Sequence, residues 1–222
     1  MWIVFESRDG SSTLLSEKFG VSYHSKYGAL QESIHVFIKE GLFYKCLVNK
    51  ELSILEMGFG TGLNALLTCV EAKKLGLKIQ YTAIERFPVD LETITKLNYC
   101  AMLGEMNGNC TFPQLHSCPW EKNNNISDYF SLIKHQLSME QVSYTNSFDL
   151  IYFDAFAPNV QPELWEPVMM EKMFAALNPR GVLVTYCAKG DFKRALKSIG
   201  FEVNTLKGPP GKREMVRAIK PL

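Results

Sequence analysis

Three glycines at alternate positions, Gly58, Gly60 and Gly62, stand where an apolar run gives way to an amphipathic one, in LEMGFGTGLN (residues 55–64). Because glycine has no Cβ, its peptide groups approach a ligand closely and adopt positive φ without steric cost. The spacing departs from the G-x-G-x-x-G dinucleotide fingerprint, and no Gly-Lys-Ser/Thr of a P-loop follows. The stretch therefore predicts a ligand loop between a strand and a helix, though not one for NAD or FAD.

Two carboxylates flank this loop in the order that one ligand would require. Glu56 precedes the glycines, where it is expected to receive an ammonium group, and Glu85 ends the next apolar run, where acidic residues bind ribose hydroxyls. A nucleoside that carries an amino acid satisfies both, which favours S-adenosylmethionine as cofactor. The alternatives are a glycine turn that serves packing alone and a Glu85 that is a solvated strand end.

Asp154 is a candidate catalytic residue because it ends the buried run FDLIYFDAFAP (residues 148–158). Phe156 and Pro158 would form a partly dry rim around a planar base or an aliphatic amine. Methyl transfer from a sulfonium requires an acceptor lone pair aligned behind the methyl group and removal of an amine proton. Asp154 would orient the amine, take its proton or stabilise the charge on nitrogen. The alternative is an aspartate that caps a turn or the next helix.

A basic stretch, KGPPGKREMVRAIK (residues 207–220), lies near the end of the chain. Such a ribbon suits phosphate contacts, and we expect Lys212 and Arg213 to contact nucleic acid, Arg213 bidentately. Alternating basic residues on the wet face of a strand pair are the alternative.

The surrounding pattern indicates an α/β fold. From about residue 52, short apolar runs alternate with amphipathic ones, as in a parallel sheet with crossover helices, and residues 201–219 read as an antiparallel pair of strands. Residues 1–50 predict a hairpin followed by a helix. We expect this extension to pack on a core of residues 51–222, because no Pro/Ser-rich linker separates the two.

Composition narrows the class without deciding it. The 222 residues are 46% hydrophobic and 21% charged, with a net charge of +1 that argues neither for nor against nucleic acid. The sequence shows neither a signal peptide nor a segment long enough to span a bilayer, so a cytoplasmic protein is expected. The six cysteines form no C-x-x-C pair and are expected to be reduced thiols, and the scattered histidines predict no metal site.

An ordered set of segments resembles the methyltransferase half of the MnmC family of tRNA-modifying enzymes, whose stand-alone form is MnmD. The segments are ILEMGFGTGLNALLT, AIERFP, FDLIYFDAFAPNVQPELWEP, GVLVTYCAKGDFKRALKSIGFEV and GPPGKREM, with VSYHSKYGALQESIHVFI as N-terminal signature. The resemblance implies a class I S-adenosylmethionine-dependent (Rossmann-like) fold with a seven-stranded sheet and an antiparallel last strand. It also implies methylation of the exocyclic amine of 5-aminomethyl(-2-thio)uridine at the tRNA wobble position, giving 5-methylaminomethyl(-2-thio)uridine.

The resemblance assigns further residues by position. Asp154 matches the family's active-site aspartate, Glu32 is a catalytic wall residue, and Tyr23 and Gln31 reach the cofactor. A Gly-Asp pair near adenine in some relatives has no clear counterpart here, so we place Trp120, or Glu121, beside the base. The cofactor loop runs through six residues: Gly58, Phe59, Gly60, Thr61, Gly62 and Asn64.

The partner implied is the anticodon stem-loop of tRNA. Bifunctional relatives carry a flavin oxidoreductase domain, whereas this chain ends at Leu222, so we expect action on the aminomethyl form after separate wobble-uridine enzymes. The open alternatives are a methyl- or aminopropyltransferase for a small-molecule amine, and an RNA-binding module that has lost its cofactor.

Overall fold

The computed structural model describes residues 2–18, 20–104 and 110–222, and a mixed eight-stranded sheet forms the centre of this part. The strand order is β10-β11-β9-β8-β4-β5-β7-β6. The strands are β4 (Glu51–Met57), β5 (Lys78–Ile84), β6 (Asn124–Ser127), β7 (Phe130–His135), β8 (Phe148–Phe153), β9 (Leu177–Thr185), β10 (Glu202–Lys207) and β11 (Glu214–Ile219).

The predicted parallel sheet with an antiparallel end is confirmed. Strands β4, β5, β7, β8 and β9 pair in parallel, and β11 pairs antiparallel with both β9 and β10. The implied count of seven strands is wrong, because a turn at residues 128–129 folds β6 back along β7 as an antiparallel edge strand.

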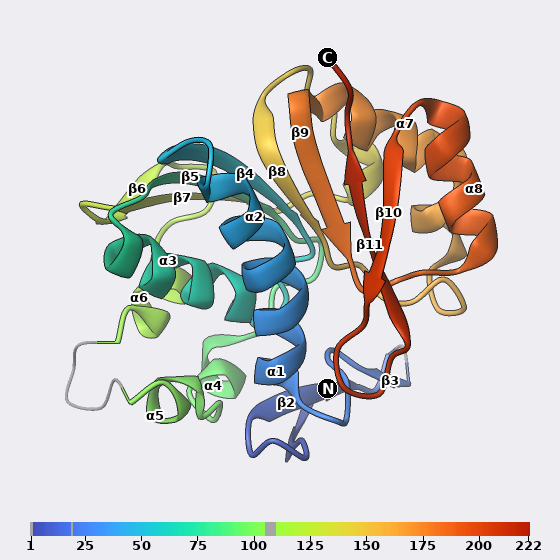
Figure 1. Cartoon of the computed structure of the whole chain (residues 1–222). Helices are drawn as coiled ribbons and strands as arrows, with labels where there is room; N and C mark the ends of the chain where they lie inside the picture. The colour runs from blue at the N-terminus through green and yellow to red at the C-terminus, as the bar shows by residue number, and fades with distance from the viewer. Residues whose placement is uncertain (1, 19, 105–109) are drawn as a thin grey trace.

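Helices cover both faces of the sheet (Figure 1). Along β4, Ile54 belongs to the apolar cluster under α3 (Leu63–Leu75). Its neighbour Leu55 belongs to the cluster under α7 (Pro167–Ala176) and α8 (Gly190–Ile199). Successive side chains of a strand point to opposite faces, so β4 is apolar on both sides and its carboxyl end is held firmly at the pocket.

The first fifty residues form a small antiparallel sheet and a long helical run. The sheet consists of β1 (Trp2–Glu6), β2 (Ser12–Ser16) and β3 (Val21–Ser22), so it includes one strand more than the expected hairpin. The helical run is α1 (Ala29–Ser33), the π-helix η1 (Ile34–Phe43) and α2 (Tyr44–Cys46). A Cβ at Gly41 would lie 3.2 Å from Tyr152 and 3.0 Å from Val184, so η1 packs directly on the large sheet.

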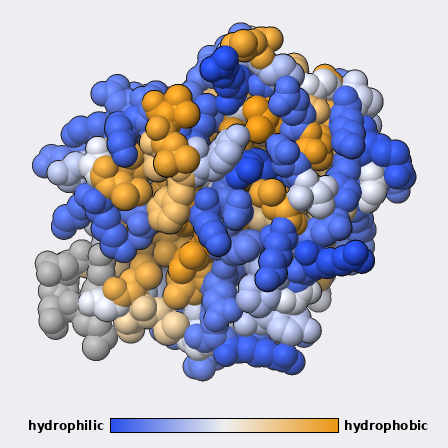
Figure 2. Space-filling view, viewed as in Figure 1, coloured by the Kyte–Doolittle hydropathy of each residue, from blue (hydrophilic) through white to orange (hydrophobic). Residues whose placement is uncertain are grey.

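The small sheet and the β10–β11 loop lie side by side at the bottom of the molecule (Figure 1), and the surface over them is mostly hydrophilic (Figure 2). Shorter helices complete the chain: α4 (Leu91–Ile94), α5 (Tyr99–Met102), α6 (Phe112–Ser117), and the 3₁₀ turns η2 (Met139–Gln141) and η3 (Pro162–Trp165). Among the described residues, no helix combines the length and apolar character that crossing a bilayer requires.

The expectation that all cysteines are reduced is wrong for one pair. Cys100 and Cys110 form a disulfide, with Cα atoms 5.8 Å apart. The pair closes the chain between α5 and α6, and its separation of ten residues matches none of the spacings from which a pair is recognised in sequence. In the described part of the chain, no three His, Cys, Asp or Glu side chains gather closely enough to hold a metal ion.

Candidate active site

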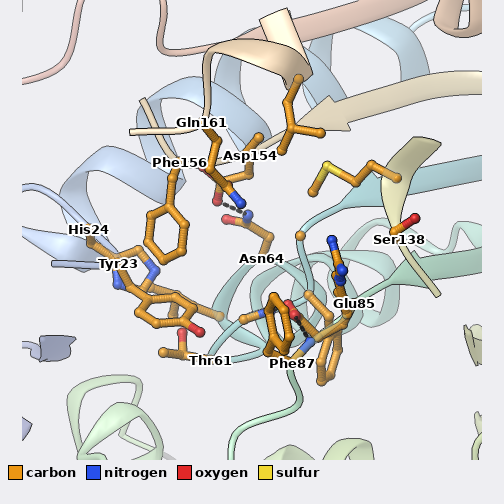
Figure 3. Close-up of a pocket in the computed structure, with 18 of the residues that line it drawn as sticks. Tyr23, His24, Thr61, Asn64, Glu85, Phe87, Ser138, Asp154, Phe156 and Gln161 are labelled. Atoms are coloured by element: carbon orange, nitrogen blue, oxygen red, sulfur yellow. Dashed lines mark hydrogen bonds between the residues drawn. The ribbon is translucent and has the colours of Figure 1, made fainter. Parts of the chain in front are cut away.

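A pocket of about 830 Å³ opens at the carboxyl ends of the parallel strands (Figure 3). This is the edge at which open α/β sheets bind their ligands. Four strand ends and the N-terminal extension contribute to it. The lining comprises Tyr23, His24, Gly58, Phe59, Gly60, Thr61, Leu63, Asn64, Glu85, Arg86, Phe87, Ser138, Met139, Glu140, Asp154, Ala155, Phe156, Gln161, Glu163 and Leu164.

The glycine loop brings bare backbone to this pocket. Gly58 has φ +97°, and a Cβ there would lie 2.8 Å from the backbone oxygen of Asp154. Gly60 has φ +51°, and its Cβ would lie 2.9 Å from the Tyr23 ring. Gly62, also at positive φ, caps α3 and faces His116, whose Nε2 would lie 2.7 Å from a Cβ. The first two glycines therefore shape the pocket, whereas the third serves helix packing.

Glu85 ties the end of β5 to the glycine loop. Its Oε2 accepts a hydrogen bond from Gly60 N–H at 2.9 Å, and its Oε1 accepts one from Phe87 N–H at 2.7 Å. Burial raises the pKa of this carboxyl, and the backbone hydrogen bonds oppose that effect. Glu85 thus lines the pocket at the position expected for a ribose ligand.

Asp154 lies next to Asn64 at the pocket (Figure 3). Its Oδ2 accepts a hydrogen bond from Asn64 Nδ2 at 2.9 Å. Burial raises the pKa of Asp154 to about 7, and the negative charge of Glu32 adds to the rise, while the Asn64 hydrogen bond and the Lys212 charge act against it. A carboxyl that titrates near neutral pH is suited to accepting a proton from an amine.

Glu32 and Lys212 form an ion pair behind this aspartate, in which Glu32 is buried and Lys212 is half-buried. Lys212 Nζ donates to Glu32 Oε1, and Ser25 N–H donates to Glu32 Oε2 at 2.8 Å. Lys212 Nζ also lies 3.7 Å from the centroid of the Tyr186 ring. Lys212 therefore lies beside the active site in an ion pair with Glu32, and its expected contact with nucleic acid stays a prediction.

Three predicted cofactor residues lie away from the pocket. Glu56 is fully buried on the face of β4 that α3 covers, so its side chain does not line the pocket as expected for an ammonium ligand. Gln31 is exposed on α1, and its backbone N–H donates to Asp9. Trp120 packs on Phe59, with ring centroids 6.3 Å apart, on the other side of the glycine loop.

Of the other predicted substrate residues, one lines the pocket and two do not. Phe156 lines the pocket and packs edge-on against Tyr23, with ring centroids 5.0 Å apart. Pro158 is absent from the described lining, and Arg213 is exposed on the β10–β11 loop.

Several pocket residues escaped the sequence analysis. Ser138 and Met139 directly follow β7, so the parallel strand order alone would have placed them at this edge. Gln161 and Leu164 lie on the segment after Asp154. His24 carried no sequence signal beyond its position next to Tyr23; burial lowers its pKa to about 4, so its imidazole is neutral.

Comparisons with known proteins agree with this geometry. A family described as S-adenosyl-L-methionine-dependent methyltransferases matches residues 119–221. The family description names the cofactor predicted from the sequence, which confirms that prediction.

Full-length relatives confirm the resemblance to MnmC. The tRNA 5-methylaminomethyl-2-thiouridine biosynthesis bifunctional protein MnmC of Actinobacillus pleuropneumoniae is 28% identical over 97% of this chain and 35% of its own length. MnmC of Leptospira interrogans is 30% identical over 92% of this chain and 33% of its own length. The chain thus spans about a third of the length of the curated relatives it matches.

Solved structures confirm the predicted class I methyltransferase fold. MNMC2 from Aquifex aeolicus superposes with a TM-score of 0.78 at 21% identity, covering 100% of this chain and 72% of that one. Spermidine synthase from Thermotoga maritima superposes with a TM-score of 0.55 at 12% identity, covering 99% of this chain and 79% of that one. At these identities the likeness concerns the fold alone.

Proposed function

We propose that this chain transfers a methyl group from S-adenosylmethionine to the exocyclic amine of 5-aminomethyl(-2-thio)uridine at the wobble position of tRNA. The observation that carries the proposal is Asp154, a half-buried carboxyl whose pKa is raised to about 7, beside a glycine loop that holds bare backbone at the same pocket. The MnmC relatives are named for biosynthesis of 5-methylaminomethyl-2-thiouridine in tRNA. Separate enzymes would first build the aminomethyl group.

Different parts of the pocket lining would hold different parts of the cofactor. The peptide groups around Gly58 and Gly60 would hold the amino-acid part, because no side chain fits there, and Glu85 would bind the ribose. Phe87, Ser138 and Met139, at the ends of β5 and β7, would surround the base. When bound, the cofactor supplies an electrophilic methyl group on its sulfonium.

The residues beside it would prepare the amine. Ionised Asp154 forms a negative site that draws in the protonated aminomethyl group, and Glu32 lies behind it in the ion pair with Lys212. Ionised Asp154 takes one proton, which frees the nitrogen lone pair for in-line attack on the methyl carbon while the C–S electrons return to sulfur. Phe156 and Tyr23 close one side of the pocket with their rings and limit access of water.

An exposed basic rim beside the pocket would bind the tRNA backbone. The Tyr27 ring joins two distant segments: Arg8 Cζ lies 4.7 Å from its centroid, and a Cβ at Gly211 would overlap it. Lys26, next to Tyr27 in the chain, and Arg213, two residues after Gly211, are both exposed. Cations around an exposed aromatic ring suit RNA phosphates and a stacked base.

Charge removal at this rim is expected to weaken tRNA binding. The double substitution Lys26→Ala and Arg213→Ala should reduce the slope of log affinity against log salt by about 1 per cation, and affinity at least about tenfold at moderate salt. Fluorescence anisotropy with labelled tRNA measures both. Lys50→Ala, an exposed cation at the opposite end of the sheet, is the control and should bind as wild type. Equal loss in the control would contradict a specific rim.

A comparison of methyl acceptors distinguishes this function from the small-amine alternative. Methyl transfer from labelled cofactor should proceed with tRNA that carries 5-aminomethyluridine. It should be at least about a thousandfold less efficient with the free nucleoside or with an aliphatic diamine, because tRNA binding energy positions the amine. Comparable kcat/KM for a free amine would favour the small-amine enzyme.

A further inference from the structure

A buried acid lies directly behind Asp154 with no aligned hydrogen-bond partner. Glu56, on β4, is fully buried, and both of its carboxyl oxygens lack a partner. Asn64 Oδ1 and Tyr81 Oη are also buried and unpaired, so four of the six such atoms in the described chain belong to this one group. Buried polar atoms are almost always paired, and a cluster of exceptions requires a reason.

The strand register places these groups together. Glu56 stands opposite Tyr152 on β8 and opposite Ala83 on β5, two residues beyond Tyr81. Helix α3 closes the layer from above. Its Thr68 hydroxyl donates to the Asn64 backbone oxygen at 2.7 Å and lies 3.3 Å from Tyr152 Oη. Asn64 and Tyr81 are the side chains within hydrogen-bonding range of the Glu56 carboxyl, although neither is aligned with it.

The surroundings of Glu56 favour its neutral form. Burial raises the pKa of Glu56 well above its usual value, and the negative charge of Asp154 raises it further, while the nearby Asn64 and Tyr81 side chains act in the opposite direction. The two charges with the largest effects on this carboxyl, Asp154 and Glu85, are both negative. This direction favours the protonated acid, whose O–H is a donor that the unpaired Asn64 Oδ1 lacks.

Asn64 requires a hydrogen-bond donor for its side-chain oxygen, and a protonated Glu56 would provide one. An amide has one acceptor oxygen and one donor nitrogen, and Asn64 already directs its Nδ2 to Asp154. Its Oδ1 is buried and has no donor. If the amide turned over, Oδ1 would face the Asp154 carboxylate and repel it.

We propose that Glu56 is a positioning residue: as a neutral acid it donates its O–H to Asn64 Oδ1 and so fixes Asn64 Nδ2 toward Asp154. This inference rests on the proposed function only for its effect on turnover. The Glu56 proton itself is a property of the folded chain.

Two substitutions with side chains of similar size test the proposed hydrogen bond from Glu56 to Asn64. Glu56→Gln carries an amide that can donate to Asn64, so kcat should stay within about threefold of wild type. Glu56→Leu cannot donate, so kcat should fall about 10- to 100-fold, as when groups that orient a reactive side chain are removed. The Kd of S-adenosylmethionine, measured by calorimetry, should stay within about threefold in both variants.

The pH profile distinguishes positioning from a general structural defect. The Asn64 hydrogen bond lowers the pKa of Asp154. Loss of that bond in Glu56→Leu should therefore move the acidic limb of the kcat profile to higher pH, while Glu56→Gln should keep the wild-type limb. If the acidic limb of the kcat profile in Glu56→Leu stayed at the wild-type pH, the proposed positioning role of Glu56 would be overturned.

Infrared difference spectroscopy tests the proton without any turnover. Wild-type minus Glu56→Gln spectra at pH 8 should contain the C=O stretch of a protonated carboxylic acid. Absence of that band, or a loss of cofactor affinity above about tenfold in Glu56→Gln, would show that Glu56 is an ionised group and would overturn the proposal. Because neither measurement uses tRNA, failure here is distinct from failure of the proposed function.

Discussion

Replacing Asp154 by asparagine is expected to lower kcat for methyl transfer by a factor of about 100 to 10,000. The substitution keeps the size of the side chain and an oxygen that can accept from Asn64 Nδ2, but it removes the group that takes the amine proton. The Kd of S-adenosylmethionine should stay within about threefold, because the glycine loop and Glu85 are unchanged. Single-turnover kinetics and calorimetry measure the two quantities, and retention of more than a tenth of kcat would show that the carboxylate is structural.

The pH dependence provides a control for the same residue. Wild-type kcat should rise with pH through about 7 as Asp154 ionises, provided that the chemical step limits turnover. Because the folded pKa of Asp154 lies above its unfolded value, its contribution to stability is fully present below about pH 4 and is lost as pH rises through about 7. Asp154→Asn has no such group, so it should not lose this stability. Its melting temperature relative to that of the wild type should therefore rise between pH 5 and pH 8.

Gly58→Ala is expected to weaken binding of S-adenosylmethionine by more than about 100-fold, or about 2.7 kcal/mol. The residue has φ +97°, and the new Cβ would lie 2.8 Å from the backbone oxygen of Asp154. The loop must therefore shift, which moves the peptide groups that hold the ligand and the carboxylate beside them. Calorimetry on the folded variant measures the loss.

Gly76→Ala is the matched control for this substitution. Gly76 ends α3 with φ +63°, and no heavy atom lies within 4 Å of its would-be Cβ. It should reduce stability by about 1–2 kcal/mol through backbone strain alone and leave cofactor binding unchanged. Equal losses of affinity in both variants would indicate general destabilisation instead of a specific cradle.

The alternation of apolar and amphipathic runs predicted the fold, because each buried parallel strand is a short apolar run in the sequence. The buried run that ends at Asp154 and the glycine loop after β4 mark two neighbouring strand ends, so the sequence also located the pocket. Side-chain direction was harder to infer. Glu56 was expected at the ligand, but strand alternation turns it under α3, one residue before the strand end at Met57.

Contacts between distant segments explain why Lys212 and Trp120 could not be placed from the sequence. Lys212 and Glu32 are 180 residues apart, and only the folded chain shows that this cation belongs to the active site. Trp120 follows α6, whose C-terminal carbonyls at Leu115 and His116 accept hydrogen bonds from the buried Lys134 ammonium, each at 2.8 Å. That anchor holds Trp120 on the far side of the glycine loop, 4.8 Å from the same ammonium.

The most direct measurement of the proposed function uses labelled S-adenosylmethionine and two tRNA pools that differ only in 5-aminomethyluridine at the wobble position. After incubation with the purified protein, the tRNA is digested and its nucleosides are identified by mass. We expect label in 5-methylaminomethyluridine from the first pool and none from the second. Absence of label from both pools, with cofactor binding intact, would contradict the assignment of tRNA as substrate.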